Sequence, residues 1–401
     1  MPQSWKPRRG PLALALLSGL ACLLLVGGVL YGTGTLQSWR EERQLSRACG
    51  GILAAPQIRT VLGSRDVGAK DTGPDGTPAS CVARARDGDS SMSLQVRWGS
   101  EDDAATRLLD RTRLFAYSAP VSPLGSWPGV LMSDQGRATV SLWLQCGNEN
   151  SKGNENSKGS KGGEGNRGSK ANEAGERAGS LTVNARLDRG TGNGAGLSSA
   201  GRHRFAAAVV ESAEKAADAA GCDHPAEGSL AGLTGSPRAH PSGLATAPGT
   251  CAGLRPLAAR AARLGLGHTW APPASGSAPV EDCVLTTAGD AQLPAYWMSA
   301  YYGPYAEDFT KRFAARVSGE RGQEKDGTLT WATASCPGTG TGHGTGTRAL
   351  FLLHGVPDND TRTGAGKVPT TGNPPAFRAD ALSAFARQSA ERHGCGDVKL
   401  P

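Results

Sequence analysis

The feature that most constrains the fold of this chain is an internal repeat that includes its cysteines. Cys49 and Cys81 are 32 residues apart, and Cys251 and Cys283 have the same separation 202 residues further along. Eight of the nine cysteines form two sets of four: Cys49, Cys81, Cys146 and Cys222, then Cys251, Cys283, Cys336 and Cys395. Glycine and apolar residues recur at the same offset, as in the pairs Gly51 and Gly253, Leu62 and Leu264, Gly63 and Gly265, and Val82 and Val284. The sequence therefore predicts two homologous domains, repeat 1 over residues 49–224 and repeat 2 over residues 249–397.

The N-terminal region predicts a membrane anchor. Residues 11–31, PLALALLSGLACLLLVGGVLY, carry no charge, and a helix of this length spans the ~30 Å hydrocarbon core of a bilayer at ~1.5 Å per residue. Three basic residues precede this segment. We therefore expect a cytoplasmic N-terminus over residues 1–10, a transmembrane signal anchor over residues 11–31 and a juxtamembrane segment over residues 32–48.

Two alternatives to a retained anchor stay open. A cleaved signal peptide usually has a shorter apolar stretch of ~7–15 residues followed by a small-residue cleavage site, and neither is clear here. Acylation of Cys22 would make the chain a lipoprotein, but Gly19 stands where such motifs usually carry leucine. A buried, unreactive Cys22 thiol is the simpler interpretation.

The other cysteines indicate the compartment. Basic residues lie on both sides of the anchor, so charge alone does not fix its orientation. An even number of cysteines at matched spacing after an export signal predicts two disulfide bonds in each repeat, which places the repeats outside the cytoplasm. Four cysteines allow three pairings, of which we favour first with second and third with fourth. No pair has the C-x₂₋₄-C spacing of a zinc site, so we expect neither a metal nor another cofactor.

The same pattern of helices and strands is predicted in both repeats. After its first cysteine, each repeat has apolar residues at helical spacing, clearest at Leu254, Leu257, Ala258, Ala261 and Leu264. A hairpin at the second cysteine, a middle helix over residues 102–115 or 304–317, two strands around the third cysteine and a last helix follow in turn. Each repeat is thus predicted as α-β-β-α-β-β-α, an α+β domain with an antiparallel sheet covered by helices.

Two segments lack the apolar residues that a packed core needs. Residues 147–179 form a Gly-, Lys- and Glu-rich insert with two tandem NENSKG copies, which predicts disorder. Replication slippage in a tolerant loop explains such an insert, and a mixed-charge tether for a wall polymer is the functional alternative. Residues 225–248 are rich in Pro, Gly and Ser and predict an interdomain linker.

The sequence shows no familiar catalytic pattern. Its seven histidines include no H-E-x-x-H pair, and no G-x-S-x-G elbow follows a strand. The acidic pairs Asp102–Asp103 and Glu307–Asp308 begin the middle helices, where negative charge interacts favourably with the helix dipole. The alternative is that they serve as catalytic acid/base groups.

Residues 1–47 hold six basic and two acidic residues, which is +4 of the net charge of +7. The remaining +3 forms no basic run, so nucleic-acid binding is not expected.

One aromatic cluster is specific to repeat 2. The stretch AYWMSAYYGPYAEDF holds four of the six tyrosines beside a tryptophan: Tyr296, Trp297, Tyr301, Tyr302 and Tyr305. Alternation along a strand sends half of its side chains inward, so core packing is the favoured interpretation of this cluster. The alternative is a binding surface of these five residues, since exposed aromatic side chains of this kind form recognition surfaces.

The cysteine-bracketed pattern, with its ACGGIL start and GC ending, resembles uncharacterised exported proteins of high-GC actinobacteria that are anchored by one helix. More loosely, each repeat is similar to modules in actinobacterial lipoproteins and in the sensor ectodomains of membrane Ser/Thr kinases. The resemblance implies no catalytic residues. The duplication, the anchor and the lack of a catalytic pattern favour a non-enzymatic, single-pass cell-membrane protein whose extracytoplasmic repeats bind or sense a cell-wall component, another ligand or an envelope protein. The alternative is an extracytoplasmic hydrolase whose catalytic residues are separated in the sequence.

Overall fold

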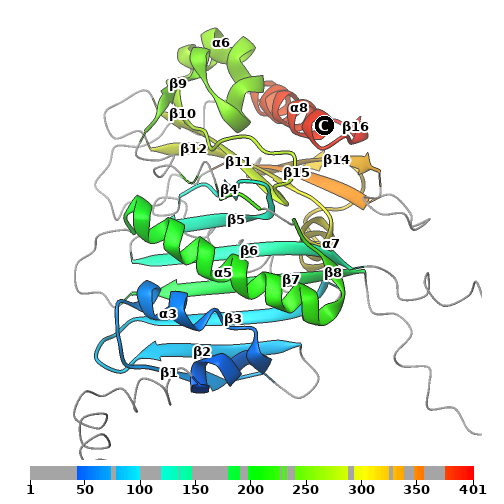
Figure 1. The fold of residues 1–401 in the computed structure, drawn as a ribbon. Coiled ribbons are helices and arrows are strands. Elements are labelled where there is room, and N and C mark those ends of the chain that lie inside the picture. The colour runs from blue at the N-terminus through cyan, green and yellow to red at the C-terminus, as the bar shows by residue number, and fades with distance from the viewer. Residues whose placement is uncertain are drawn as a thin grey trace, which may run out of the picture.

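A computed structural model gives the fold of the chain (Figure 1). It describes residues 43–73, 78–99, 119–134, 136–146, 179–189, 197–225, 228–230, 233, 240–287, 293–324, 328–337, 347–355 and 375–401. Both repeats are α+β, and each has an antiparallel sheet, as expected.

Repeat 1 forms a sheet with the strand order β1-β2-β3-β7-β6-β5-β4, and β8 pairs with the end of β6. The strands are β1 (Val67–Asp71), β2 (Ala79–Ala85), β3 (Ser91–Trp98), β4 (Ser122–Leu124), β5 (Trp127–Asp134), β6 (Arg137–Cys146), β7 (Ser180–Asp188) and β8 (Cys222–Asp223). The described helices of this repeat are η1 (Ala48–Gly51), α3 (Ala55–Leu62) and α5 (Ser199–Ala220).

Repeat 2 forms a second sheet with the order β13-β14-β15-β12-β11-β10-β9, and β16 pairs with β14. The strands are β9 (Ser242–Gly243), β10 (Leu266–Trp270), β11 (Val280–Thr287), β12 (Pro294–Tyr301), β13 (Gly322–Gln323), β14 (Leu329–Cys336), β15 (Thr347–Gly355) and β16 (Gly396–Lys399). The helices are η6 (Leu244–Thr246), η7 (Gly249–Leu257), α6 (Ala258–Arg263), α7 (Pro304–Arg312) and α8 (Pro375–Arg392).

Five neighbouring strands of the two sheets share one pairing order. In repeat 1 the order β1-β2-β3-β7-β6 matches β10-β11-β12-β15-β14 in repeat 2, and β8 corresponds to β16. The expected α-β-β-α-β-β-α pattern omits β1, β4, β5 and β8 in repeat 1 and β9, β10, β13 and β16 in repeat 2. Apart from the eight-residue β5, these strands are two to five residues long, so they carry little alternation for sequence reasoning to detect. The middle helix expected over residues 102–115 lies outside the described residues.

Each long helix covers one face of its own sheet. In Figure 1, α3 and α5 lie across the sheet of repeat 1, and α8 lies over the sheet of repeat 2. Helix α5 begins at the N-cap Ser198, whose hydroxyl accepts from the N–H of Gly201, and ends at Gly221 in the left-handed conformation. Alternation along β6 sends Val140, Leu142 and Leu144 into this helix-covered core.

Four disulfide bonds connect the elements in the pairing that we favoured. Cys49 bonds to Cys81 and Cys146 to Cys222 in repeat 1, and Cys251 bonds to Cys283 and Cys336 to Cys395 in repeat 2. The first disulfide bond of each repeat links the opening helical segment to a strand, β2 in repeat 1 and β11 in repeat 2. The second bond ties the end of the last helix to the end of β6 or β14.

The second faces of the two sheets pack against each other. Val130 of β5 joins Tyr301, Tyr305 and Phe309 of repeat 2 in one apolar cluster. The hydroxyl of Tyr305 on α7 also hydrogen-bonds to Ser141 on β6. This contact contains an apolar cluster of its own, so the two repeats share a buried interface.

Of three predicted segments, one lies outside the described residues and two meet them only in part. No helix among the described residues is long and apolar enough to cross a membrane, and residues 11–31 lie outside them. The expected insert, residues 147–179, lies outside them except for Gly179. Within the expected linker, residues 225–248, Ser242 and Gly243 form β9 against β10, and the carbonyl of Ser229 accepts from the N–H of Ser126 in repeat 1.

Candidate functional site

A cavity of about 370 Å³ lies where the two repeats meet. Both repeats contribute to its wall, mostly through residues at the ends of strands and helices. The lining residues are Pro128, Trp143, Gln145, Asp223, His224, Pro225, Gly276, Ser277, Ala278, Pro279, Tyr302, Gly303, Cys336, Pro337, His393 and Cys395. The volume lies within the range of ~300–1,000 Å³ that is typical of small-molecule sites.

The wall from repeat 1 is built around its second disulfide. Gln145 on β6 pairs with Asp223 on β8, directly beside the bonded Cys146 and Cys222. The ring of His224 is stacked on the fully buried Trp127, with 6.1 Å between centroids. The strand pairing that the disulfide anchors therefore also fixes the first polar side of the cavity.

His224 is also bonded to an acidic residue outside the cavity. Its Nε2 lies 3.1 Å from Oδ1 of Asp218 on α5. This hydrogen bond raises the pKa of the His224 imidazole above its ordinary value, and burial opposes the shift only in part.

The wall from repeat 2 brings Tyr302, the Cys336–Cys395 disulfide and His393 together. The Tyr302 and His393 rings are stacked with 3.7 Å between centroids, and both side chains are more than nine-tenths buried. Gly303, directly after Tyr302, has φ +54, and a Cβ there would overlap the indole ring of Trp143. Only glycine meets both conditions, so this position sets how closely the repeats approach each other.

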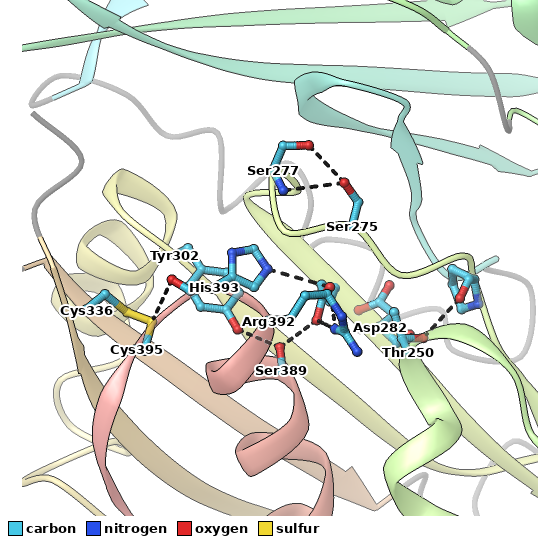
Figure 2. A network of polar contacts seen from close by, with 12 residues as sticks. Thr250, Ser275, Ser277, Asp282, Tyr302, Cys336, Ser389, Arg392, His393 and Cys395 are labelled. Carbon is cyan, nitrogen blue, oxygen red and sulfur yellow. Dashed lines mark hydrogen bonds and ion pairs between the residues drawn. A yellow bond between two sulfur atoms is a disulfide. The ribbon is translucent and has the colours of Figure 1, made fainter.

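Behind this wall lies a buried ionic network centred on Glu281 of β11, and Figure 2 shows its members Ser389, Arg392 and His393. Glu281 is 2% exposed. Nη1 of Arg392 donates to both of its carboxylate oxygens, at 2.7 and 2.6 Å, and the hydroxyl of Ser389 donates to Oε2 at 2.5 Å. Nε2 of His393 lies 3.6 Å from Oε1. Since the one proton of Ser389 goes to Glu281, the hydroxyl of Tyr302 donates to Ser389, at 2.5 Å.

The network determines the charge state of its members. Burial raises the pKa of the Glu281 carboxyl, but the contact with His393, the charge of Arg392 and the bond from Ser389 together outweigh it. The pKa of Glu281 therefore lies below its ordinary value, and the carboxylate is ionised at neutral pH. Burial and the nearby Glu281 charge raise the pKa of Tyr302 well above its ordinary value, so this phenol keeps its proton.

Repeat 1 has no such network at the corresponding positions. Counting back from the last cysteine of each repeat, Ala216, Ala219 and Ala220 stand where repeat 2 has Ser389, Arg392 and His393. Two residues before the second cysteine, Ala79 corresponds to Glu281, and the strand register puts Trp98 in the place of Tyr302. Since repeat 1 forms the same sheet without these groups, the fold alone does not require them.

The structure corrects the alternative of an aromatic binding surface. The five residues of the cluster, Tyr296, Trp297, Tyr301, Tyr302 and Tyr305, are at most 5% exposed, which matches the favoured interpretation of core packing. One face of β12 meets α8, and Tyr301 on the other face packs against Phe309 of α7 and joins Val130 of repeat 1 in one apolar cluster, so neither face lies in solvent. Of the five, Tyr302 alone lines the cavity.

Of the cysteines singled out from sequence, Cys336 and Cys395 line the cavity, whereas Glu307 and Asp308 are not among its lining residues. Glu307 is in the first turn of α7, and Oδ1 of Asp308 accepts from Arg312 one turn later, which is the helix-terminus arrangement. Asp102 and Asp103 lie outside the described residues. In the described ranges, no group of three His, Cys, Asp or Glu side chains is placed to hold a metal ion.

Sequence reasoning missed Glu281, Ser389, Arg392 and the role of His393. One signal for Glu281 was present in the sequence. The strand VEDCVLTT carries two adjacent acids in an otherwise uncharged apolar stretch, and acids in such a stretch indicate buried, paired carboxylates. The partners of Glu281 lie more than 100 residues away on α8, with no local pattern that links them.

The comparisons with known proteins return no relative: no family model matches the chain, and neither the curated proteins nor the solved structures contain a significant match.

Proposed function

We propose that this chain is a non-enzymatic, membrane-anchored envelope protein whose two repeats bind a small ligand between them. The observation that carries the proposal is the cavity of about 370 Å³, to which both repeats contribute side chains. A cavity at a domain junction with a few convergent polar groups is the usual form of a ligand site. The buried network in repeat 2 supports it, because repeat 1 folds without one.

The disulfides and the N-terminal segment support the envelope location. Four disulfide bonds are typical of proteins that fold in an oxidising compartment. Residues 11–31 have the length and apolarity of a signal anchor. An intact mass of membrane-extracted protein, alkylated before and after reduction, tests this part. We expect residues 1–31 to be retained and eight cysteines to be blocked until reduction.

The geometry of the polar network favours binding over hydrolysis. Ser389, His393 and Glu281 are the residue types of a catalytic triad, but the hydroxyl of Ser389 donates to Glu281. A serine nucleophile needs its hydroxyl bonded to the histidine, with the carboxylate on the other side of that ring. Ser389 is also 1% exposed. The cluster therefore works as a rigid polar support for the cavity wall.

Native mass spectrometry of the full chain, released from the membranes of cells that express it, tests the ligand-binding function. We expect a bound small molecule, or one acquired from a small-molecule extract of those cells. Pro337→Trp places a large ring at the exposed rim of the cavity and should abolish the mass increment. Pro273→Trp is the matched control, since Pro273 is exposed but lies outside the cavity lining.

The two outcomes are distinct. An increment that survives Pro273→Trp and disappears with Pro337→Trp supports a ligand in this cavity. The absence of any bound molecule from both the purified protein and the extract, or an increment that Pro337→Trp leaves intact, would overturn the proposal.

A further inference from the structure

We infer that the ligand of this cavity is an uncharged, ring-bearing molecule that donates a hydrogen bond to Nδ1 of His393. The inference rests on the proposed ligand-binding function and adds to it the chemistry of the ligand and the group that recognises it.

The charges around the cavity argue for an uncharged ligand. The lining contains neither lysine nor arginine, and its one carboxylate belongs to Asp223, which is exposed. The nearest arginine, Arg392, gives both of its close contacts to Glu281. The imidazole of His224 is bonded to Asp218. An ionic ligand would thus lose its hydration without gaining a partner of opposite charge, which is costly in a partly enclosed site.

The shape of the wall argues for a ring. Four prolines, Pro128, Pro225, Pro279 and Pro337, make much of the lining rigid and apolar. Trp143 comes from repeat 1, and the stacked pair of Tyr302 and His393 comes from repeat 2. Flat, stiff surfaces of this kind pack best against a planar or cyclic molecule, through offset-stacked or edge-to-face contacts.

The buried network assigns the proton of His393. The carboxylate of Glu281 only accepts hydrogen bonds, and its contacts with His393 and Arg392 keep it ionised. Nε2 of His393 is buried, makes no hydrogen bond and lies 3.6 Å from this carboxylate, so the neutral imidazole carries its proton on Nε2. Nδ1 is then an acceptor, and Figure 2 shows the second ring nitrogen of His393 on the side of the ring away from the dashed contact. Since His393 lines the cavity and no bond to Nδ1 is present within the described part of the chain, Nδ1 is available to a donor on the ligand.

Three naphthalenes that differ in one group test the inference. 2-Naphthol is uncharged and donates a hydrogen bond, 2-methoxynaphthalene has the ring without the donor, and 2-naphthoate is an anion. Calorimetric titrations use the full chain in lipid nanodiscs at pH 8, with empty nanodiscs as the reference for partition. We expect 2-naphthol to bind roughly two- to tenfold more tightly than the methoxy compound, as one net hydrogen bond provides, and 2-naphthoate to bind more weakly than 2-naphthol.

Two matched variants locate the acceptor. His393→Phe keeps a ring stacked on Tyr302 but removes Nδ1, so the preference for 2-naphthol over 2-methoxynaphthalene should disappear. His224→Phe changes the other imidazole of the same cavity, and the preference should persist. If His393→Phe fails to fold, the ¹⁵N chemical shift of His393 Nδ1 in the unmodified protein replaces it, with a shift expected on addition of 2-naphthol and none with the methoxy compound.

Three results would overturn the inference. These are tightest binding of 2-naphthoate, equal affinity for the naphthol and its methyl ether, and a donor preference that His393→Phe leaves unchanged. A protein that retains a cell-derived ligand in the native mass spectrum but binds none of the three naphthalenes would also overturn it, while leaving the proposed ligand-binding function in place.

Discussion

The carboxylate of Asp282 in repeat 2 accepts a hydrogen bond of 2.9 Å from the backbone N–H of Val121 in repeat 1. Its other oxygen accepts from the hydroxyl of Ser299 at 2.7 Å, and the side chain is fully buried. The preceding residue, Glu281, points to the opposite face of β11, toward α8. The two adjacent acids thus stabilise different parts of the molecule. Asp282 stabilises the junction of the repeats, and Glu281 stabilises the wall of the cavity.

Removing the Asp282 carboxylate should weaken the junction. In Asp282→Ala, the N–H of Val121 and the hydroxyl of Ser299 lose their acceptor in a buried site, and each unsatisfied group costs about 1–3 kcal/mol. We expect the free energy of unfolding, measured by urea titration, to fall by about 3 kcal/mol. Ser299→Ala, which removes only one donor, is the control and should cost about 1 kcal/mol. Equal effects of the two variants would show that the bond to Val121 adds no stability.

The Glu281–Arg392 pair offers a test in which repeat 1 serves as the template. Arg392→Ala leaves a buried carboxylate without its main partner and should lower the free energy of unfolding by about 3–5 kcal/mol. The double variant Glu281→Ala/Arg392→Ala reproduces Ala79 and Ala219 of repeat 1, and it should recover most of that loss. Guanidinium chloride unfolding measures both proteins. A double variant no more stable than Arg392→Ala would mean that the loss comes from packing rather than from the uncompensated charge.

Acid should destabilise the protein through the same carboxylate. The pKa of Glu281 in the folded state lies below its ordinary value of 4.5, chiefly because its contacts with His393 and Arg392 outweigh burial. A group with a depressed folded pKa adds stability above the unfolded pKa and loses it as the pH falls toward the folded one. We therefore expect the free energy of unfolding to decline from about pH 4.5 downward. The Glu281→Ala/Arg392→Ala variant should show a shallower decline in that window, and an identical slope in the two proteins would rule out Glu281 as a source.

Local signals made much of the scaffold predictable. The cysteine spacing divides eight cysteines into two matched sets, and the favoured pairing within each set, one of three that the spacing allows, is the observed one. The burial of the aromatic residues around Tyr301 was harder to predict. A strand exposes half of its side chains only when one face of its sheet is free, and here α7 and repeat 1 cover the second face. The cavity depends on how the repeats dock, which brings Trp143 and Tyr302 together from opposite repeats and leaves no periodic trace in either segment.

The docking distance itself rests on Gly303, where a side chain would meet both backbone strain and steric contact. Gly303→Ala imposes φ +54 and ψ −135, outside the αL region, at a cost on the order of 1–3 kcal/mol, and also pushes its Cβ into the Trp143 ring. Gly265→Ala is the control for a positive φ without contact, because Gly265 has φ +75 but nothing within 4 Å of a Cβ. We expect Gly303→Ala to lower the midpoint of thermal unfolding clearly more than Gly265→Ala, and to weaken ligand binding, which Gly265→Ala leaves unchanged. Because the excess arises from contact with one ring, adding Trp143→Ala to Gly303→Ala should cost less stability than Trp143→Ala costs alone. Full additivity of the two changes would show that the repeats do not meet at this contact.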